Sequence, residues 1–128
     1  MAISYRIDVE RDLVLVEGSG VLNDVDLLSF RKSLVDDPLF HPDMMELADF
    51  RSVERHEHTT EGFNQFLELE KSIIKQLGNY RIAIVTRSDL HYGFSRMYKA
   101  QVADVLPQVN VFRDMDEAQA WLFGESEA

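Results

Sequence analysis

One short segment limits the fold of this chain more than any other. Residues 82–85 form an unbroken apolar run, Ile-Ala-Ile-Val, which lies between Arg81 and Arg87. A run without polar alternation is typical of a strand that is buried on both faces. Strands of this kind belong to parallel sheets, which are covered by their crossover helices. The segment therefore predicts an α/β protein.

The remaining pattern repeats strand and helix after a two-stranded start. Residues 3–9 alternate apolar and polar side chains, and a second β-rich run leads from residue 13 through Gly18 and Gly20, which permit a bulge, to Leu22. Further strands are predicted at residues 44–50 and 109–112, and an irregular polar loop at residues 51–58. A first helix is predicted after a cap at Asn23 or Asp24 and ends before residues 36–38. Three more helices are predicted from Thr59 or Thr60 to Leu77, from Ser88 to near Pro107, and from Asp114 to residue 123. The expected fold is an antiparallel hairpin followed by mostly parallel strands, with four helices.

Length and composition indicate one globular domain. The chain has 128 residues, of which 45% are hydrophobic and 28% charged, which is a balance typical of folded proteins. We expect a single domain over residues 1–124 and a frayed acidic tail over residues 125–128. Either a monomer or a homodimer formed through the exposed edge of the N-terminal hairpin is compatible with this organisation.

Charge and residue usage exclude several classes of function. The 13 basic and 23 acidic side chains give a net charge of −10, which disfavours nucleic-acid binding. No cysteine is present, so thiol catalysis and thiolate metal sites are excluded. The first ten residues alternate in polarity and resemble neither a signal peptide nor a membrane anchor. We therefore expect a cytoplasmic protein that is not transmembrane and needs no cofactor.

Three arginines follow predicted parallel strands at the edge of the sheet where ligands collect. Arg51, Arg87 and Arg113 form a candidate anion-binding site for a phosphate or carboxylate group. The alternative is that they pair with Asp49, Asp89 and Asp114 on a solvated rim, where ion pairs contribute little.

Two threonines stand where the second helix should begin. Thr59 and Thr60 fit the role of helix caps. A phosphate at this position would also meet the helix dipole favourably, so the same residues suit a phosphorylation switch.

Aromatic side chains crowd the second and third helices. Phe63, Phe66, Phe94, Met97 and Tyr98 are expected to pack in the core or, alternatively, to line an apolar ligand pocket between helices and sheet.

Other titratable residues give weaker signals. His56 and His58 flank Glu57, but two imidazoles lack a third ligand at zinc spacing, so no metal site is predicted. His91 is expected in the first turn of the third helix, and Glu68 with Glu70 on a polar helix face. No Ser, His and Asp pattern surrounds a nucleophile elbow, so no enzyme is predicted.

Five segments of the chain form a recognisable set: Tyr5-Arg6-Ile7-Asp8, Gly20-Val21-Leu22 leading into residues 24–28, Asp49-Phe50-Arg51-Ser52-Val53, Thr59-Thr60-Glu61-Gly62 and Arg96-Met97-Tyr98. Together they resemble the SpoIIAA-like family, which is related to STAS domains and anti-sigma factor antagonists. The resemblance implies the same fold. It also implies that Asp49, Thr60 and Gly62 match the positions of an aspartate, a phosphorylated serine and a glycine in STAS antagonists. Thr59 and Arg51 depart from that motif.

Two functions follow as hypotheses. The first is a non-catalytic regulatory module that meets a protein partner through the rim near Thr60 and the second helix. The second is a binder of a small amphiphilic or lipid-like ligand between helices and sheet, with its acidic head on Arg51, Arg87 or Arg113 and with association to a membrane surface.

Overall fold

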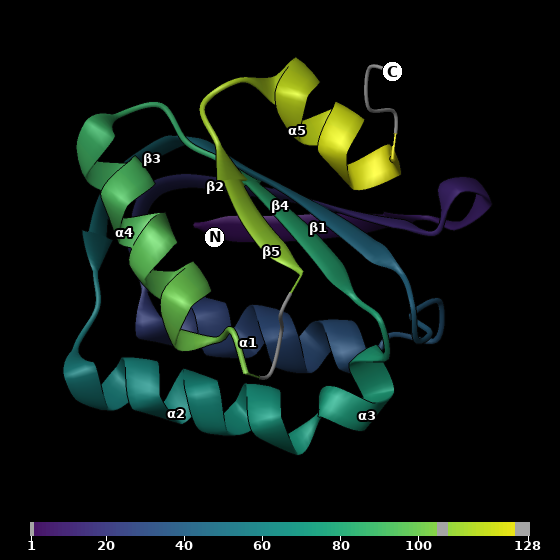
Figure 1. The fold of residues 1–128 in the computed structure, drawn as a ribbon. Helices are drawn as coiled ribbons and strands as arrows, with labels where there is room; N and C mark the ends of the chain where they lie inside the picture. Colours follow the sequence, from purple (N-terminus) through teal and green to yellow (C-terminus); the bar gives the residue numbers. More distant parts are fainter. Residues whose placement is uncertain (1, 105–107, 125–128) are drawn as a thin grey trace.

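The strands of the sheet lie side by side in the order in which they occur in the chain. The structure is a computed structural model that describes residues 2–104 and 108–124 (Figure 1). Its strands are β1 (Ile3–Asp8), β2 (Leu13–Asn23), β3 (Met45–Glu57), β4 (Arg81–Val85) and β5 (Val109–Phe112). β1 is antiparallel to β2, and all the following pairs are parallel. The predicted hairpin and parallel sheet are confirmed.

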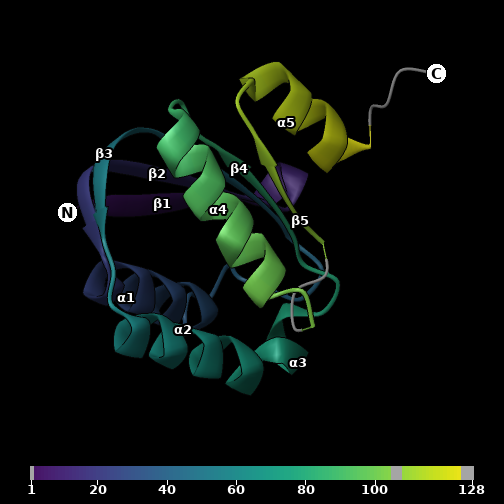
Figure 2. The same cartoon turned by 60° about the vertical axis from the view of Figure 1, so that its left-hand side comes forward.

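This strand order decides where the helices lie. Crossovers between parallel strands share one hand, so a sheet that grows in one direction receives all of them on one face. α1 (Asp24–Val35), α2 (Thr60–Ser72), the single turn α3 (Ile74–Leu77) and α4 (Asp89–Gln101) pack on that face. Figures 1 and 2 show α5 (Met115–Phe123), which follows the last strand, across the sheet from α1, α2 and α3.

Alternation along the strands separates two cores. Ile82 and Ile84 of β4 face the helices α1 to α4, whereas Ala83 and Val85 face α5. The same alternation in β3 places Glu46, Ala48 and Phe50 on the crossover side and Met45 and Leu47 on the α5 side. The run at residues 82–85 is therefore buried on both faces, as its composition predicts.

β3 corrects the prediction of a loop at residues 51–58. The strand continues to Glu57 because the long second half of β2 pairs with it, from Ser19 opposite Ser52 to Asn23 opposite Glu57. The pairing of β3 with β4 ends where Asp49 lies opposite Val85. Beyond that point β3 is covered on one edge only, which explains its polar sequence. The register shifts at Gly18 to Gly20 confirm the predicted bulge.

The second predicted helix is two helices. α2 ends at Ser72, and Ile73 leaves helical geometry before α3 begins, so the described segments contain five α-helices and one 3-10 turn (Val9–Arg11) where four helices were expected. Gly78 ends α3 with φ +62°, a conformation that favours glycine. The third predicted helix was expected to end near Pro107, but α4 already ends at Gln101, where Val102 is the C-cap. The acidic tail lies outside the described residues.

No helix within residues 2–104 and 108–124 has the length and apolar character that a membrane span requires.

Candidate functional site

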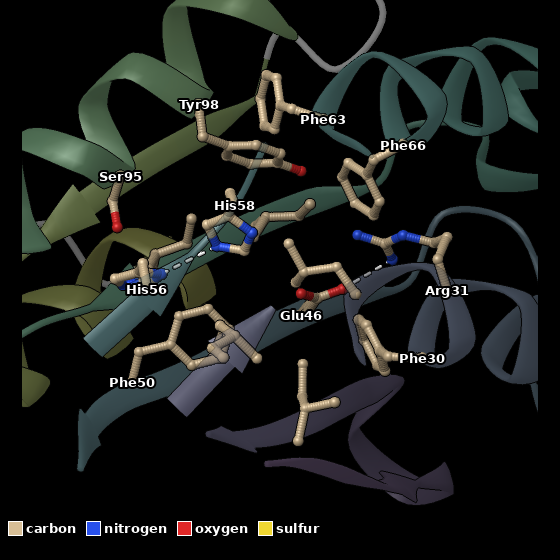
Figure 3. Close-up of a pocket in the computed structure, with 16 residues that line it drawn as sticks. Phe30, Arg31, Glu46, Phe50, His56, His58, Phe63, Phe66, Ser95 and Tyr98 are labelled. Carbon is tan, nitrogen blue, oxygen red and sulfur yellow. Dashed lines mark hydrogen bonds and ion pairs between the residues drawn. The ribbon is translucent and has the colours of Figure 1, made fainter. Parts of the chain in front are cut away.

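A hollow lies between the sheet and the helices α1, α2 and α4, and we call it the inner pocket. Its volume is about 60 Å³, several times the roughly 10–15 Å³ that one water needs. Figure 3 shows its lining, which combines aromatic and aliphatic side chains with a few polar groups. The lining residues are Ile3, Leu22, Leu27, Phe30, Arg31, Glu46, Ala48, Phe50, His56, His58, Phe63, Phe66, Ile82, Ile84, Ser95 and Tyr98.

Arg31 and Glu46 line one end of the inner pocket and, together with Glu70 behind them, form what we call the buried ion group. Arg31 Nη1 donates a hydrogen bond to Glu46 Oε1 at 3.0 Å, and Arg31 Nε lies 2.9 Å from Glu70 Oε1. Tyr80 Oη donates to Glu46 Oε1 at 2.7 Å. Arg31, Glu46 and Glu70 are at most 4% exposed. The guanidinium group of Arg31 therefore pairs with two buried carboxyl groups.

Burial and pairing shift the ionisation of this group in opposite directions. Burial opposes the charge on Arg31, but Glu70 and Glu46 outweigh it and hold the pKa of Arg31 well above its ordinary value. Burial raises the pKa of Glu70, although Arg31 acts against this rise. Arg31 is therefore a permanent cation, while the carboxyl group of Glu70 holds a proton more readily than an ordinary glutamate does.

Helical spacing explains how these charges reach the core. Leu27, Phe30, Arg31 and Leu34 recur at intervals of three and four, which places them on one face of α1. Glu70 falls on the inner face of α2, seven residues after Phe63. The expectation that Glu70 lies on a polar face is therefore wrong. The sequence signal was present, since both charged residues interrupt apolar stripes.

The other end of the inner pocket holds histidines from β3 and the segment that follows it (Figure 3). His56 Nδ1 lies 3.1 Å from His58 Nε2, and His58 Nδ1 lies 3.0 Å from Asp24 Oδ1. The ring of His91, in the first turn of α4, meets the ring of His56 edge to face at 4.8 Å between centroids. The sequence placed His91 correctly in its helix, but nothing in the pattern indicated its contact with His56.

The carboxylate of Asp24 orders this chain of rings. Burial opposes ionisation of Asp24, but hydrogen bonds from Thr59 and His58 outweigh it and lower the pKa of its carboxyl group. When both rings are neutral, His58 donates from Nδ1 to Asp24 and accepts from Nδ1 of His56, which leaves Nε2 of His56 without a proton. Burial, with smaller effects of His58 and His91, lowers the pKa of His56 from 6.5 to about 4. His56 is therefore an uncharged group at neutral pH.

Thr59 is the N-cap of α2, and Thr60 is its first residue. The hydroxyl of Thr59 accepts a hydrogen bond from Gly62 N at 2.9 Å, and the N–H and hydroxyl of Thr59 both donate to Asp24 Oδ2. A Cβ on Gly62 would overlap the Asp24 carboxylate, so glycine permits this close approach. Thr60 is exposed on the rim.

The three candidate arginines lie outside the inner pocket, and two of them, Arg51 and Arg113, are paired with carboxylates. Arg51 binds Asp49 through Nε at 2.9 Å and Nη2 at 2.8 Å. Hydrogen bonds from Arg51, together with the charge of Arg87, lower the pKa of Asp49 although burial acts against this. Arg113 pairs with Asp89 and lies over the ring of Tyr92. Asp49 therefore binds Arg51 and is influenced by the charge of Arg87, while Arg113 pairs with Asp89. Asp114 caps α5.

The predicted aromatic set divides between two places. Phe63, Phe66 and Tyr98 line the inner pocket, with the Tyr98 ring centroid 6.3 Å from that of Phe63 and 6.0 Å from that of Phe66. Met97 is 60% exposed and lines a surface groove with Thr59 and Thr60, which we call the outer groove. His58, Phe63 and Tyr98 line both hollows and therefore separate them. The side chain of Phe94 lies outside the described residues.

The site offers hydrogen bonding and shape, not metal ligation. Within residues 2–104 and 108–124, no group of three or more His, Asp or Glu side chains is arranged to hold a metal ion. What the arrangement provides is an apolar enclosure with an ion pair at one end and imidazoles at the other.

No protein-family model matches the sequence, and no curated protein matches it. Among solved structures, the chain is similar to the crystal structure of an uncharacterised protein of the DUF3478 family from Shewanella loihica, described as having a SpoIIAA-like fold. The match has a TM-score of 0.63 and 19% sequence identity, and it covers 94% of each chain. The SpoIIAA-like fold is thus confirmed. At this identity the likeness establishes the fold alone.

Proposed function

We propose that this protein is a non-catalytic binding module that holds a small, mainly apolar molecule in the inner pocket. The main support for this proposal is the inner pocket itself. It lies under α2 and α4 and is lined by aromatic rings with a few polar side chains. Protein interiors are close-packed, and an unfilled hollow of this size costs stability. Ligand sites have the same composition, an apolar wall with a small number of placed polar groups.

The size of the inner pocket limits the ligand. About 60 Å³ is less than half of the roughly 150 Å³ cavity that takes up benzene. A single ring therefore enters only when side chains of the lining move, and an extended acyl chain does not fit. A lipid would need α2 and α4 to separate, and Tyr98 holds them together by packing its ring near Phe63 and Phe66. The proposal therefore narrows the amphiphilic ligand to a small one.

A pocket-filling variant tests this function. Ser95 is 4% exposed, comes from α4 and lines the inner pocket, so Ser95→Leu should fill the space that a ligand needs. Arg96→Leu adds the same side chain to the exposed side of the same helix and is the matched control. We expect benzyl alcohol and indole to shift NMR signals of residues lining the inner pocket in wild type and Arg96→Leu, but not in Ser95→Leu. Equal shifts in folded Ser95→Leu would place binding elsewhere and refute the proposal.

A second candidate function is supported by a different observation. Thr60 is exposed at the first turn of α2 and lines the outer groove beside the exposed Met97. A regulatory module would bind a protein partner here and release it when Thr60 gains a phosphate.

The test is a pull-down from the native host with wild type, Thr60→Glu and Gln65→Glu. Gln65 is also exposed on α2 but does not line the outer groove, so its variant adds the same charge to the same helix outside that groove. We expect a partner that wild type and Gln65→Glu retain and Thr60→Glu loses. A partner bound equally by all three would remove Thr60 from the interaction.

A further inference from the structure

The charge of the ligand can be deduced from the groups around the inner pocket, given the proposed function on which this inference rests. A buried site that binds a carboxylate needs a cation that is not already neutralised, because an unpaired buried charge is costly. The relevant observation is therefore the balance of charges at each end of the inner pocket.

At the end near α1, the only cation lining the pocket is already paired. Arg31 contacts Glu46 at 3.0 Å and Glu70 at 2.9 Å, and these three side chains are almost completely buried. The buried ion group carries no net positive charge, whether or not Glu70 holds its proton. A ligand carboxylate at this end would be repelled by the negative charge of Glu46, and a ligand cation would be repelled by the positive charge of Arg31.

At the other end the polar groups are uncharged or already neutralised. The low pKa of His56 keeps its ring neutral at pH 7, and His58 contacts the carboxylate of Asp24. Of the three rim arginines, Arg51 is bound to Asp49, Arg113 is bound to Asp89, and Arg87 is exposed to solvent. None of them lines the inner pocket.

We propose that the inner pocket selects an uncharged small ring compound with one hydrogen-bonding group, and rejects both the matching carboxylate and the matching amine. The ring packs against Phe30, Phe50 and Phe66, and the polar group lies at the histidine end. This reverses the sequence-based hypothesis of an acidic head bound by Arg51, Arg87 or Arg113.

Three probes of the same shape test the selectivity. Benzyl alcohol, benzoate and benzylamine are titrated at pH 7 into wild type, Ser95→Leu and Arg96→Leu, with dissociation constants taken from NMR shifts. Benzyl alcohol should bind wild type at least about tenfold more tightly than either ion, a difference of roughly 1.4 kcal/mol. Loss of binding in Ser95→Leu assigns the signal to the inner pocket.

A charge-removing variant sharpens the result. Glu46→Gln keeps an acceptor for Arg31 and Tyr80 but leaves the buried ion group with one cation and at most one anion. We expect the preference for benzyl alcohol over benzoate to fall severalfold in Glu46→Gln. It should remain in Glu68→Gln, which removes an exposed carboxylate of α2.

The outcomes separate the two proposals. If none of the three probes binds wild type, the proposed function fails together with the selectivity. If benzoate or benzylamine binds wild type as tightly as the alcohol, and Ser95→Leu abolishes that binding, the function stands and the selectivity is overturned. Should Glu46→Gln fail to fold, the wild-type ratios alone decide the question.

Discussion

The two faces of the sheet are covered by helices in different ways. On the α5 face, Ala118 and Leu122 close over Leu13, Leu47 and Val85, and the buried members of this cluster are all apolar. On the crossover face, a larger apolar core surrounds the buried ion group and the inner pocket. One face is simple packing, while the other buries charge beside a hollow.

The difference indicates where function lies. A buried ion pair is weak support for stability, because apolar residues of similar size often serve as well or better. The α5 face shows that this sheet can be covered without charges: its nearest cation, Arg81, lies at the edge and donates to the carbonyls of Trp121 and Leu122 at the end of α5. Packing alone therefore does not require the charges of the crossover face, and the proposed binding function would account for them.

Removing the cation of the buried ion group gives the strongest test of this difference between the two faces. Arg31→Met keeps much of the side-chain volume but leaves two buried carboxyl groups without a partner. We expect a loss of about 3–5 kcal/mol in the free energy of unfolding, measured in urea. Glu70→Gln should change it by less than about 1 kcal/mol, because an amide can replace a surplus carboxyl group. A stable Arg31→Met would show that the charges are not coupled.

The corresponding truncation on the α5 face should act on stability alone. Leu122 is fully buried against the sheet, so Leu122→Ala is expected to cost about 2–4 kcal/mol. Binding of benzyl alcohol by the folded fraction should be unchanged, because the inner pocket lies on the other side of the sheet. Weakened binding in folded Leu122→Ala would mean that the two faces act as one unit.

The histidine end predicts a pH effect that the α5 face does not share. The pKa of His56 is about 4 in the folded protein and near 6.5 when unfolded, so the unfolded state takes up the proton first. The contribution of His56 to the free energy of unfolding is complete above pH 6.5 and is lost as the pH falls toward 4. Because the ring is partly exposed, we expect a loss of about 1 kcal/mol between pH 7 and pH 5.

Two variants assign this loss to His56. His56→Gln should reduce the change in unfolding free energy between pH 7 and pH 5, measured in urea at each pH. His41→Gln should not reduce it. Hydrogen bonding to the Pro42 carbonyl and to Asp12 raises the pKa of exposed His41, so His41 contributes with the opposite sign. An unchanged pH dependence in His56→Gln would contradict the low pKa.

The fold was largely predictable because its signals are local. The apolar run in β4, the alternation in β1 and the helical stripes each depend on a few neighbouring residues. β3 beyond Asp49 was missed because its strand character comes from pairing with β2, which no local pattern reveals. The break at Ile73 was missed for a similar reason, since the apolar stripe continues from α2 into α3.

The candidate site was only partly predictable. Phe63, Phe66 and Tyr98 were found through helical spacing, but Arg31 and Glu46 received no role, and Glu70 was assigned to a polar face. Charged residues are normally expected on the surface, so the sequence alone does not indicate that these three are buried. Their burial is possible only because they pair with one another, and that pairing is visible only in the structure. The contact between His56 and His91 joins residues far apart in the chain, so spacing alone could not show it.

The smallest effect separates the two threonines at the entrance to the crossover face. Thr59 caps α2 and also donates to Asp24, so Thr59→Ala should lower the unfolding free energy by about 1 kcal/mol. Thr60 is exposed, and Thr60→Ala should change it by less than about 0.5 kcal/mol. Urea titration of both variants measures the difference. A modifiable residue must be replaceable without loss of the fold, so equal losses in the two variants would assign Thr60 to structure and count against a phosphorylation switch there.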